Sequence, residues 1–143
     1  MLEVIEMKII IAVLLLALCL PAMAEELPDL KGNWTGVMDF VGYDKNTAWQ
    51  PNETVSYWPG EGWNLTITEQ NGRSFSGMMI PKGSPRSEEV ILGVLSQDNE
   101  SITIVDENGM LWGSVNSPTE IELYYQEVGI DGMTVGGGVF KKA

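Results

Sequence analysis

The chain contains no histidine, and its one cysteine, Cys19, lies in an apolar N-terminal run. The Ser-His-Asp and Cys-His catalytic arrangements are therefore excluded, and a zinc or haem site built on His or Cys is excluded once that run is removed. Histidine is also the commonest general base in enzymes. We therefore expect a binding protein and not an enzyme, with no cofactor and no metal site.

Positive charge is scarce, with 8 Lys and Arg against 20 Asp and Glu and a net charge of −12 at pH 7. Binding to nucleic acid depends on clustered Lys and Arg that neutralise phosphates, so we expect no nucleic-acid partner. An acidic surface of this kind can instead attract a basic protein partner.

Long hydrophobic runs are absent apart from residues 9–20, and this run is too short for a membrane-spanning helix, which needs about 20 apolar residues. Lys8 precedes the run, and Pro21 and the small-residue triplet 22–24 follow it, as in a cleaved secretory signal. The three residues before Cys19 put a large leucine where a lipid-attachment motif carries a small residue. We therefore expect export with no stable membrane anchor.

Cleavage after Ala24 would make residues 1–24 a signal peptide and leave residues 25–143 as one domain. It removes two acidic residues and one basic residue, which changes the net charge from −12 to −11, and leaves no cysteine for a disulfide. The two acidic residues are unusual at the start of a signal, so either Met1 or Met7 could be the true start. We expect the mature protein to be secreted, or to lie in a cell-surface or periplasmic space.

Apolar and polar residues alternate with a period of two through most of the mature chain, which predicts an all-β fold. Turn-forming Gly, Asn, Pro and Ser residues separate eight candidate strands. The spacing of these strands, about ten residues, is typical of a barrel or a sandwich. We predict an eight-stranded antiparallel up-and-down β-barrel, with a β-sandwich as the alternative. The candidate strands cover residues 32–41, 62–70, 73–80, 88–96, 100–106, 110–116, 120–127 and 133–141.

Two of the predicted hairpins carry an aromatic residue three positions after an Asn-Gly pair. A three-residue loop would pair Ile67 with Phe75 and Ile104 with Trp112, whereas a two-residue turn would turn both aromatic rings to the opposite face. We predict the first register, because it unites the apolar face. The predicted interior then consists of Trp34, Met38, Phe40, Trp63, Leu65, Ile67, Phe75, Leu92, Val94, Ile102, Ile104, Trp112, Leu123 and Tyr125.

Two segments depart from the regular strand pattern. Gly136, Gly137 and Gly138 leave the last strand without side chains to pack, which predicts either tight curvature there or a bulky neighbour that fills the space, with Trp34 and Phe140 as the candidates. Residues 42–61 form the longest predicted connection. Connections of this length in a compact domain are usually functional lids or disordered segments, and the four aromatic residues of this one, Tyr43, Trp49, Tyr57 and Trp58, favour a lid over disorder.

The chain resembles the calycin-like barrels, the group that includes lipocalins and avidins. Gly32-Asn33-Trp34 matches the G-x-W with which lipocalins open their first strand, and the eight strands and the two terminal lysines agree with that pattern. The resemblance implies a single ligand cavity inside the barrel, and a late basic residue, here Lys141, packed over Trp34. The chain departs from lipocalins in having no disulfide, and the biotin-contacting residues of avidins do not map onto it, so biotin is not implied.

The remaining polar motifs have simpler explanations. Glu120 and Glu122, and also Glu88 and Glu89, are spaced like a carboxylate pair, but their places near strand ends favour a solvated rim over a glycosidase site. The acidic turn at 106–108 lacks the spaced ligands of a calcium loop. Four N-x-S/T sequons are candidate N-glycosylation sites, which would have to face outward, at Asn33, Asn52, Asn64 and Asn99.

These features favour a secreted barrel that binds a small, mostly apolar molecule, with the aromatic connection 42–61 closing over it. The alternative is a secreted or cell-surface module that binds or inhibits a protein partner through its loop tips and acidic face, on a solid barrel. The candidate ligand-binding residues are Trp34, Tyr43, Trp49, Tyr57, Trp58, Trp63, Trp112 and Tyr125.

Overall fold

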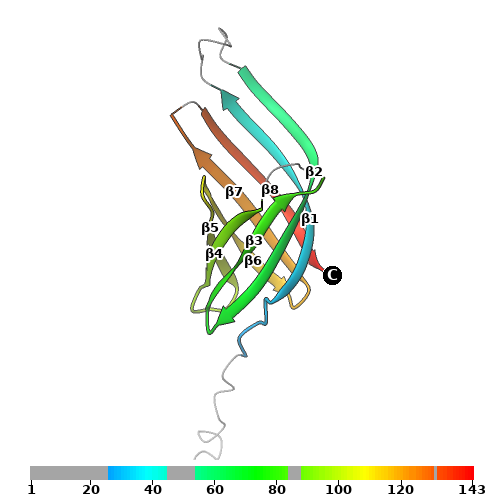
Figure 1. Ribbon diagram of the computed structural model, residues 1–143, viewed down its shortest axis with the longest axis vertical. Helices are drawn as coiled ribbons and strands as arrows, with labels where there is room; N and C mark the ends of the chain where they lie inside the picture. Colours follow the sequence, from blue (N-terminus) through cyan, green and yellow to red (C-terminus); the bar gives the residue numbers. More distant parts are fainter. Residues whose placement is uncertain (1–25, 45–53, 84–87, 131) are drawn as a thin grey trace, which may run out of the picture.

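A computed structural model describes residues 26–44, 54–83, 88–130 and 132–143, and confirms the predicted all-β fold. Eight antiparallel strands follow one another around a closed barrel, and the last strand pairs with the first (Figure 1). The predicted signal peptide, residues 1–24, lies outside the described ranges. The strands are β1 (Gly32–Asp44), β2 (Thr54–Asn71), β3 (Ser74–Pro81), β4 (Glu89–Leu95), β5 (Ser101–Val105), β6 (Met110–Ser117), β7 (Glu120–Val128) and β8 (Gly132–Lys142).

The strands differ in length, and this gives the barrel an uneven open end. β1 and β2, with 13 and 18 residues, are longer than β4 and β5, with 7 and 5 residues. In Figure 1, β1, β2, β7 and β8 rise past the shorter strands at the top of the view. Within the described ranges we find no apolar helix of the length that a membrane crossing requires.

The predicted connection 42–61 is shorter than expected, because strand pairing continues through both of its ends. Tyr43 is paired with Val55, and Phe40 with Trp58. The Pro59-Gly60 step, which looks like a loop in the sequence, instead lies beside an irregularity in the β1–β2 register. There Gly60 has a φ of 73° and its amide donates a 2.7 Å hydrogen bond to Asp39 Oδ1. Glycine accepts this left-handed conformation at no steric cost.

The two hairpin registers that we predicted are wrong. Ile67 lies opposite Gly77, because the β2–β3 turn contains two residues and β2 has a register shift after Ile67. Ile104 lies opposite Leu111, because the β5–β6 connection has four residues instead of three. Leu111 therefore points inward, and Trp112 points outward, where it stacks on Tyr124 with ring centroids 6.1 Å apart.

Most of the predicted interior is confirmed, with three exceptions. Leu92 and Val94 are about half exposed on the outer face of β4, and Trp112 is on the outer face of β6. In their place, the inward positions of these strands hold Ile91, Leu95 and Leu111. The buried core consists of Leu30, Trp34, Met38, Leu65, Ile67, Phe75, Met79, Ile91, Leu95, Ile102, Ile104, Leu111, Ile121, Leu123 and Phe140.

The end of the barrel near the N-terminal lead-in is closed around Trp34. Its indole Nε1 donates a 2.9 Å hydrogen bond to the Leu30 carbonyl, and the amide of Gln70 accepts from Leu30 N and donates to Pro28 O. The cation over the indole ring is Lys142, with Nζ 5.3 Å from the ring centroid, and not Lys141 as predicted. Lys142 is the cross-strand neighbour of Trp34, whereas Lys141 points outward to Glu120 at 3.8 Å. This closed end leaves the opposite end of the barrel for a ligand.

Aromatic rings do fill the space over two of the three consecutive glycines of β8, but they are different rings from those predicted, and the space over Gly138 is taken by the backbone of Val37. A Cβ at Gly136 would strike the ring of Phe40, and a Cβ at Gly137 would lie 2.8 Å from the ring of Tyr124. Trp34 and Phe140 instead belong to the core at the closed end. Gly136 thus gives Phe40 room to lie across the inside of the barrel.

Candidate ligand-binding site

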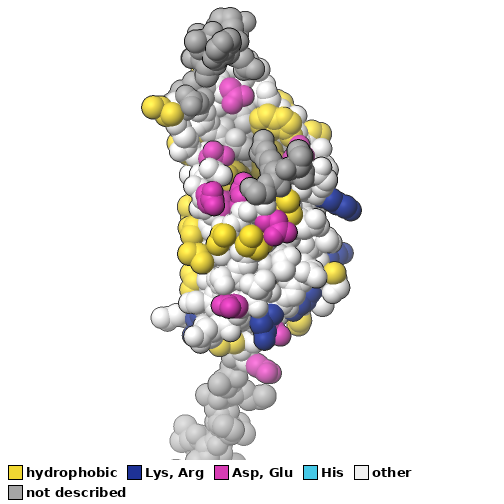
Figure 2. All heavy atoms as spheres, in the orientation of Figure 1, with side chains coloured by type: hydrophobic (Ala, Val, Ile, Leu, Met, Phe, Trp, Pro, Cys, Tyr) yellow, Lys and Arg dark blue, Asp and Glu magenta, His cyan; other side chains and the backbone are white. Residues whose placement is uncertain are grey.

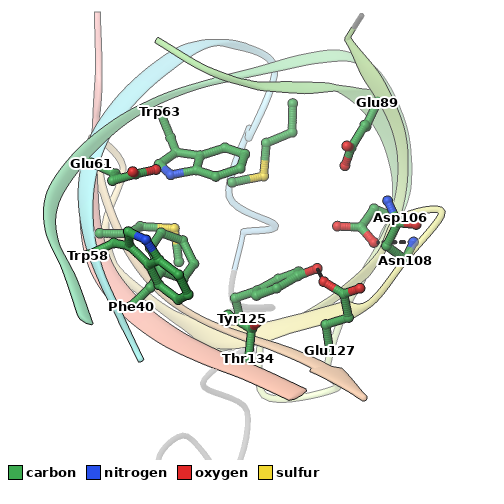
Figure 3. A pocket seen from close by; sticks show the side chains of 12 residues that line it. Phe40, Trp58, Glu61, Trp63, Glu89, Asp106, Asn108, Tyr125, Glu127 and Thr134 are labelled. Atoms are coloured by element: carbon green, nitrogen blue, oxygen red, sulfur yellow. Dashed lines mark hydrogen bonds between the residues drawn. The ribbon is translucent and has the colours of Figure 1, made fainter. Parts of the chain in front are cut away.

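A cavity of about 410 Å³ opens at the end of the barrel opposite Trp34. Sites for small molecules commonly fall in the range of about 300–1,000 Å³. Figure 3 shows the cavity with aromatic rings along one side and the carboxylates of Glu89, Asp106 and Glu127 along the other. Its lining consists of Met38, Phe40, Trp58, Glu61, Trp63, Met79, Glu89, Asp106, Asn108, Tyr125, Glu127 and Thr134.

Three rings in contact form the apolar side of the cavity. The Phe40 ring lies 5.9 Å from the Trp63 ring at an interplanar angle of 50°, and 6.1 Å from the Tyr125 ring at 75°, measured between centroids. Tilted and edge-on arrangements of this kind are the favoured geometries for aromatic pairs. The Trp58 ring joins them from β2, seated against Gly42, where a Cβ would lie 2.7 Å from the ring. Glycines on β1 and β8 therefore position two of the four rings.

The carboxylates of the cavity arise from the same inward alternation that builds the core. In β7 the inward residues Ile121 and Leu123 are followed by Tyr125 and then by Glu127 at the open end. Three other strands follow the same pattern. Toward the open end, the apolar inward residues are followed by Glu61 on β2, Glu89 on β4 and Asp106 directly after β5. We did not predict these four side chains as cavity residues. Continuing each apolar alternation by one further step would have found them.

Asp106 has a structural role as well as a place in the lining. Its Oδ1 accepts hydrogen bonds from the backbone amides of Asn108, at 2.9 Å, and Gly109, at 2.5 Å. This is the usual way in which an aspartate closes a tight turn. One carboxylate oxygen is thus held by the turn, which fixes the direction of the side chain into the cavity (Figure 3).

Two polar groups on the aromatic side bear on what the cavity can hold. The buried Nε1 of Trp63 has no hydrogen-bond partner among the residues that the structure describes. A buried donor without a partner destabilises the protein, so a ligand that supplies an acceptor to this N–H would bind more tightly. The Tyr125 hydroxyl donates a 2.9 Å hydrogen bond to Glu127 Oε2. Burial raises the pKa of Tyr125 far above its ordinary value, and the bond to Glu127 and the nearby charges of Asp106, Glu127 and Glu89 raise it further.

The raised pKa of Tyr125 predicts a late-titrating tyrosine. We compare the pH titration of tyrosinate absorbance in the original protein and in a Tyr125→Phe variant. The part of the absorbance that the variant lacks belongs to Tyr125, and in the folded protein it should appear above pH 10. Because the folded pKa exceeds the unfolded one, Tyr125 contributes stability below the unfolded pKa of about 10 that is lost as the pH rises toward the folded pKa. The variant should therefore lose stability less steeply above pH 10. A Glu127→Gln variant should shift the titration downward, and an ordinary pKa for Tyr125 would contradict the packing.

The structure brings three of the eight predicted ligand-binding residues together in this cavity, Trp58, Trp63 and Tyr125. Trp34 is buried at the closed end, and Trp112 lies on the outer face of β6. Of the remaining predicted residues, the two that the structure describes do not belong to this lining. Tyr57 is 74% exposed on β2, Tyr43 lies half-buried in β1 beyond the cavity, and Trp49 is outside the described residues.

The other carboxylates singled out in the sequence lie elsewhere. Glu120 pairs with Lys141, and Glu122 accepts a 2.7 Å hydrogen bond from the Tyr124 hydroxyl on the outer face of β7. In the described part of the chain, no three acidic side chains are close enough together to hold a metal ion. Figure 2 shows acidic side chains gathered toward the upper half of one face, with most of the Lys and Arg at its lower right.

The sequons differ in how accessible their asparagines are. Asn33 is exposed on β1, and Asn64 is half-buried on β2. Asn99 is only 8% exposed, has a φ of 62°, and accepts a 3.0 Å hydrogen bond from Arg73 Nη2 through Oδ1. Asn52 is outside the described residues. Asn99 is thus poorly placed to carry a glycan, which needs a free side-chain amide.

Comparison with known proteins adds no relative to this description. No protein-family model matches the chain, and no curated protein is significantly similar to it.

Proposed function

We propose that this protein is an exported binding protein that holds one small, mostly apolar molecule in the cavity at the open end of its barrel. The observation that carries the proposal is the cavity of about 410 Å³, lined by Phe40, Trp58, Trp63 and Tyr125. A concave site that combines an apolar, aromatic wall with polar groups that point into it is the usual form of a small-molecule site. The buried indole Nε1 of Trp63 supplies one of those polar groups.

We further propose that the chain is a calycin-like barrel, related to the lipocalins. Two features support this relationship beyond the strand count. The tryptophan of the Gly32-Asn33-Trp34 motif is buried at the closed end, and Lys142 lies over its ring, in the role that the resemblance gave to a late basic residue. Both features leave the opposite end of the barrel open, which is where a single ligand cavity would be expected in such a fold.

A neutral apolar dye tests the binding proposal directly. N-phenylnaphthylamine carries no charge at neutral pH and becomes fluorescent in apolar surroundings. We expect saturable binding of one dye per chain, with quenching of tryptophan emission. A Thr134→Trp variant adds bulk to the lining and should weaken dye binding about tenfold or more. Trp58→Ala, which removes a ring that is 38% exposed, should weaken binding without adding volume.

The matched control is Thr103→Trp, which adds the same side chain on the outer face of β5 and should leave dye binding unchanged. Thermal unfolding of each variant checks that it is folded. Equal weakening by the Thr134 and Thr103 substitutions would place the dye outside the cavity and overturn the proposal. Absence of any dye binding would favour the alternative, a protein-binding module that needs no cavity.

A further inference from the structure

The cavity carries a concentration of negative charge on one side. Figure 3 shows the carboxylates of Glu89, Asp106 and Glu127 directed into the space from β4, from the β5–β6 turn and from β7. Glu61 stands across the cavity, on the same strand as Trp63. No Lys or Arg belongs to the described residues that line the cavity. The aromatic side of the cavity therefore faces an acidic side.

Three of the described basic residues are engaged away from this acidic side. Lys141 lies 3.8 Å from Glu120 on the outer face, and Lys142 donates a 2.8 Å hydrogen bond to the Asp29 carbonyl at the closed end. Arg73 is bound to Ser96 and Asn99 in the β4–β5 turn. A cleft lined by charges of one sign between apolar walls concentrates the field and attracts ions of opposite sign.

We propose that the ligand is a small organic cation, with a charged ammonium or related group attached to a flat apolar body. This proposal rests on the cavity being the binding site, as argued above, and adds the charge of the ligand. The apolar body would pack against Phe40, Trp58 and Trp63, and the cationic group would point toward Glu127 and Asp106. Aromatic faces also attract cations, so both sides of the cavity favour positive charge.

An organic cation fits this arrangement better than a metal ion does. The carboxylates come from four separate places around the barrel, and among the described residues no three of them are close enough to bind one ion. Half of the lining residues are aromatic or methionine, and their apolar surfaces offer nothing to a hard cation that requires oxygen ligands. A bulky cation with an apolar body makes contact with both.

A series of three probes with the same aromatic body and different charges tests the proposal. Phenethylammonium is cationic, phenethyl alcohol is neutral and hydrocinnamate is anionic. Binding is followed by the indole N–H signals of the ¹⁵N-labelled protein, with the signal of Trp63 assigned from a Trp63→Phe variant. We expect the ammonium to bind about tenfold more tightly than the alcohol and the anion to bind least, with the difference shrinking as salt is added.

Glu127→Gln provides the test at the level of one residue. It keeps an acceptor for the Tyr125 hydroxyl and removes one unit of charge from the cavity, so the preference for the ammonium over the alcohol should fall about fivefold. Glu61→Gln should act in the same direction. The matched control is Glu122→Gln, which removes the same charge beside the Tyr124 hydroxyl on the outer face and should leave the preference unchanged.

The possible outcomes separate this proposal from the one on which it rests. If the ammonium and the alcohol bind equally, or if N-phenylnaphthylamine binds and the ammonium does not, the charge proposal is overturned while the cavity remains the binding site. If the dye and all three probes fail to bind, the binding proposal fails with it. Butylammonium has the charge of a lysine side chain without the aromatic body. Equal binding of butylammonium and phenethylammonium would point to a lysine of a protein partner and overturn the small-molecule proposal.

Discussion

Replacement of Trp34 by alanine is expected to lower the free energy of unfolding by about 3–5 kcal/mol, the usual cost of removing a large buried aromatic side chain. Trp34 is 0% exposed and closes one end of the barrel. Its loss also removes the hydrogen bond from Nε1 to the Leu30 carbonyl and the ring beneath Lys142 Nζ. Urea unfolding followed by far-ultraviolet circular dichroism measures the change, provided that the slope with denaturant stays constant.

Two further substitutions separate the contributions to this effect. Trp34→Phe keeps an aromatic ring but leaves the Leu30 carbonyl without its donor, and should cost less than the alanine variant, about 1–3 kcal/mol. Trp112→Ala removes the same side chain from the outer face of β6, where Trp112 is 37% exposed and stacks on Tyr124, and should cost about 1 kcal/mol. A similar loss for the Trp34 and Trp112 alanine variants would show that the closed end is not a packed core.

Strands β7 and β4 show how far the alternation of polar and apolar residues can predict this fold. In β7, polar residues at every second position leave one apolar face, so the inward placement of Leu123 and Tyr125 could be predicted. In β4, the stretch from Val90 to Leu95 is apolar at every position except Gly93, so alternation cannot choose between its two faces. The structure turns Gly93 inward because the ring of Phe75 occupies the space above it. This choice depends on a neighbouring strand.

The register of the two Asn-Gly hairpins could not be predicted from their local sequence either. The chemistry of an Asn-Gly pair allows loops of two, three or four residues, and a difference of one residue exchanges the two faces of a strand. The four-residue β5–β6 connection is closed by hydrogen bonds to Asp106, a contact that the prediction of a shorter loop did not include. Trp112 was accordingly assigned to the interior in place of Leu111.

The aromatic part of the candidate site could be predicted from the sequence, but its carboxylates were not. Aromatic residues near the open end drew attention to Trp58, Trp63 and Tyr125, which do line the cavity. The acidic side was missed, because charged residues near strand ends are ordinarily solvated. Once the register is known, Glu127 is the inward residue that follows Tyr125, and its role in the cavity follows from the period of two.

Gly113→Ala is expected to lower the free energy of unfolding by about 3 kcal/mol, a change at the upper end of those caused by overpacking. The position of the added Cβ is already taken by the backbone carbonyl of Glu122, and the Cα of Leu123 would be 3.0 Å away. Because the obstacle is backbone and not the end of a flexible side chain, β6 would have to move away from β7. That movement would break ladder hydrogen bonds on the side of the barrel that carries Tyr125.

Gly129→Ala is the matched control for this substitution. Gly129 does not have a positive φ, and the nearest atom to an added Cβ would be the Gly132 carbonyl oxygen at 3.8 Å, an ordinary contact. Alanine there should leave stability unchanged or raise it by up to about 1 kcal/mol, because it restricts the unfolded chain. If urea unfolding gave the same stability for the two variants, β6 and β7 could not approach as closely as described, and the inward direction of Leu111 and Tyr125 would need to be reassigned.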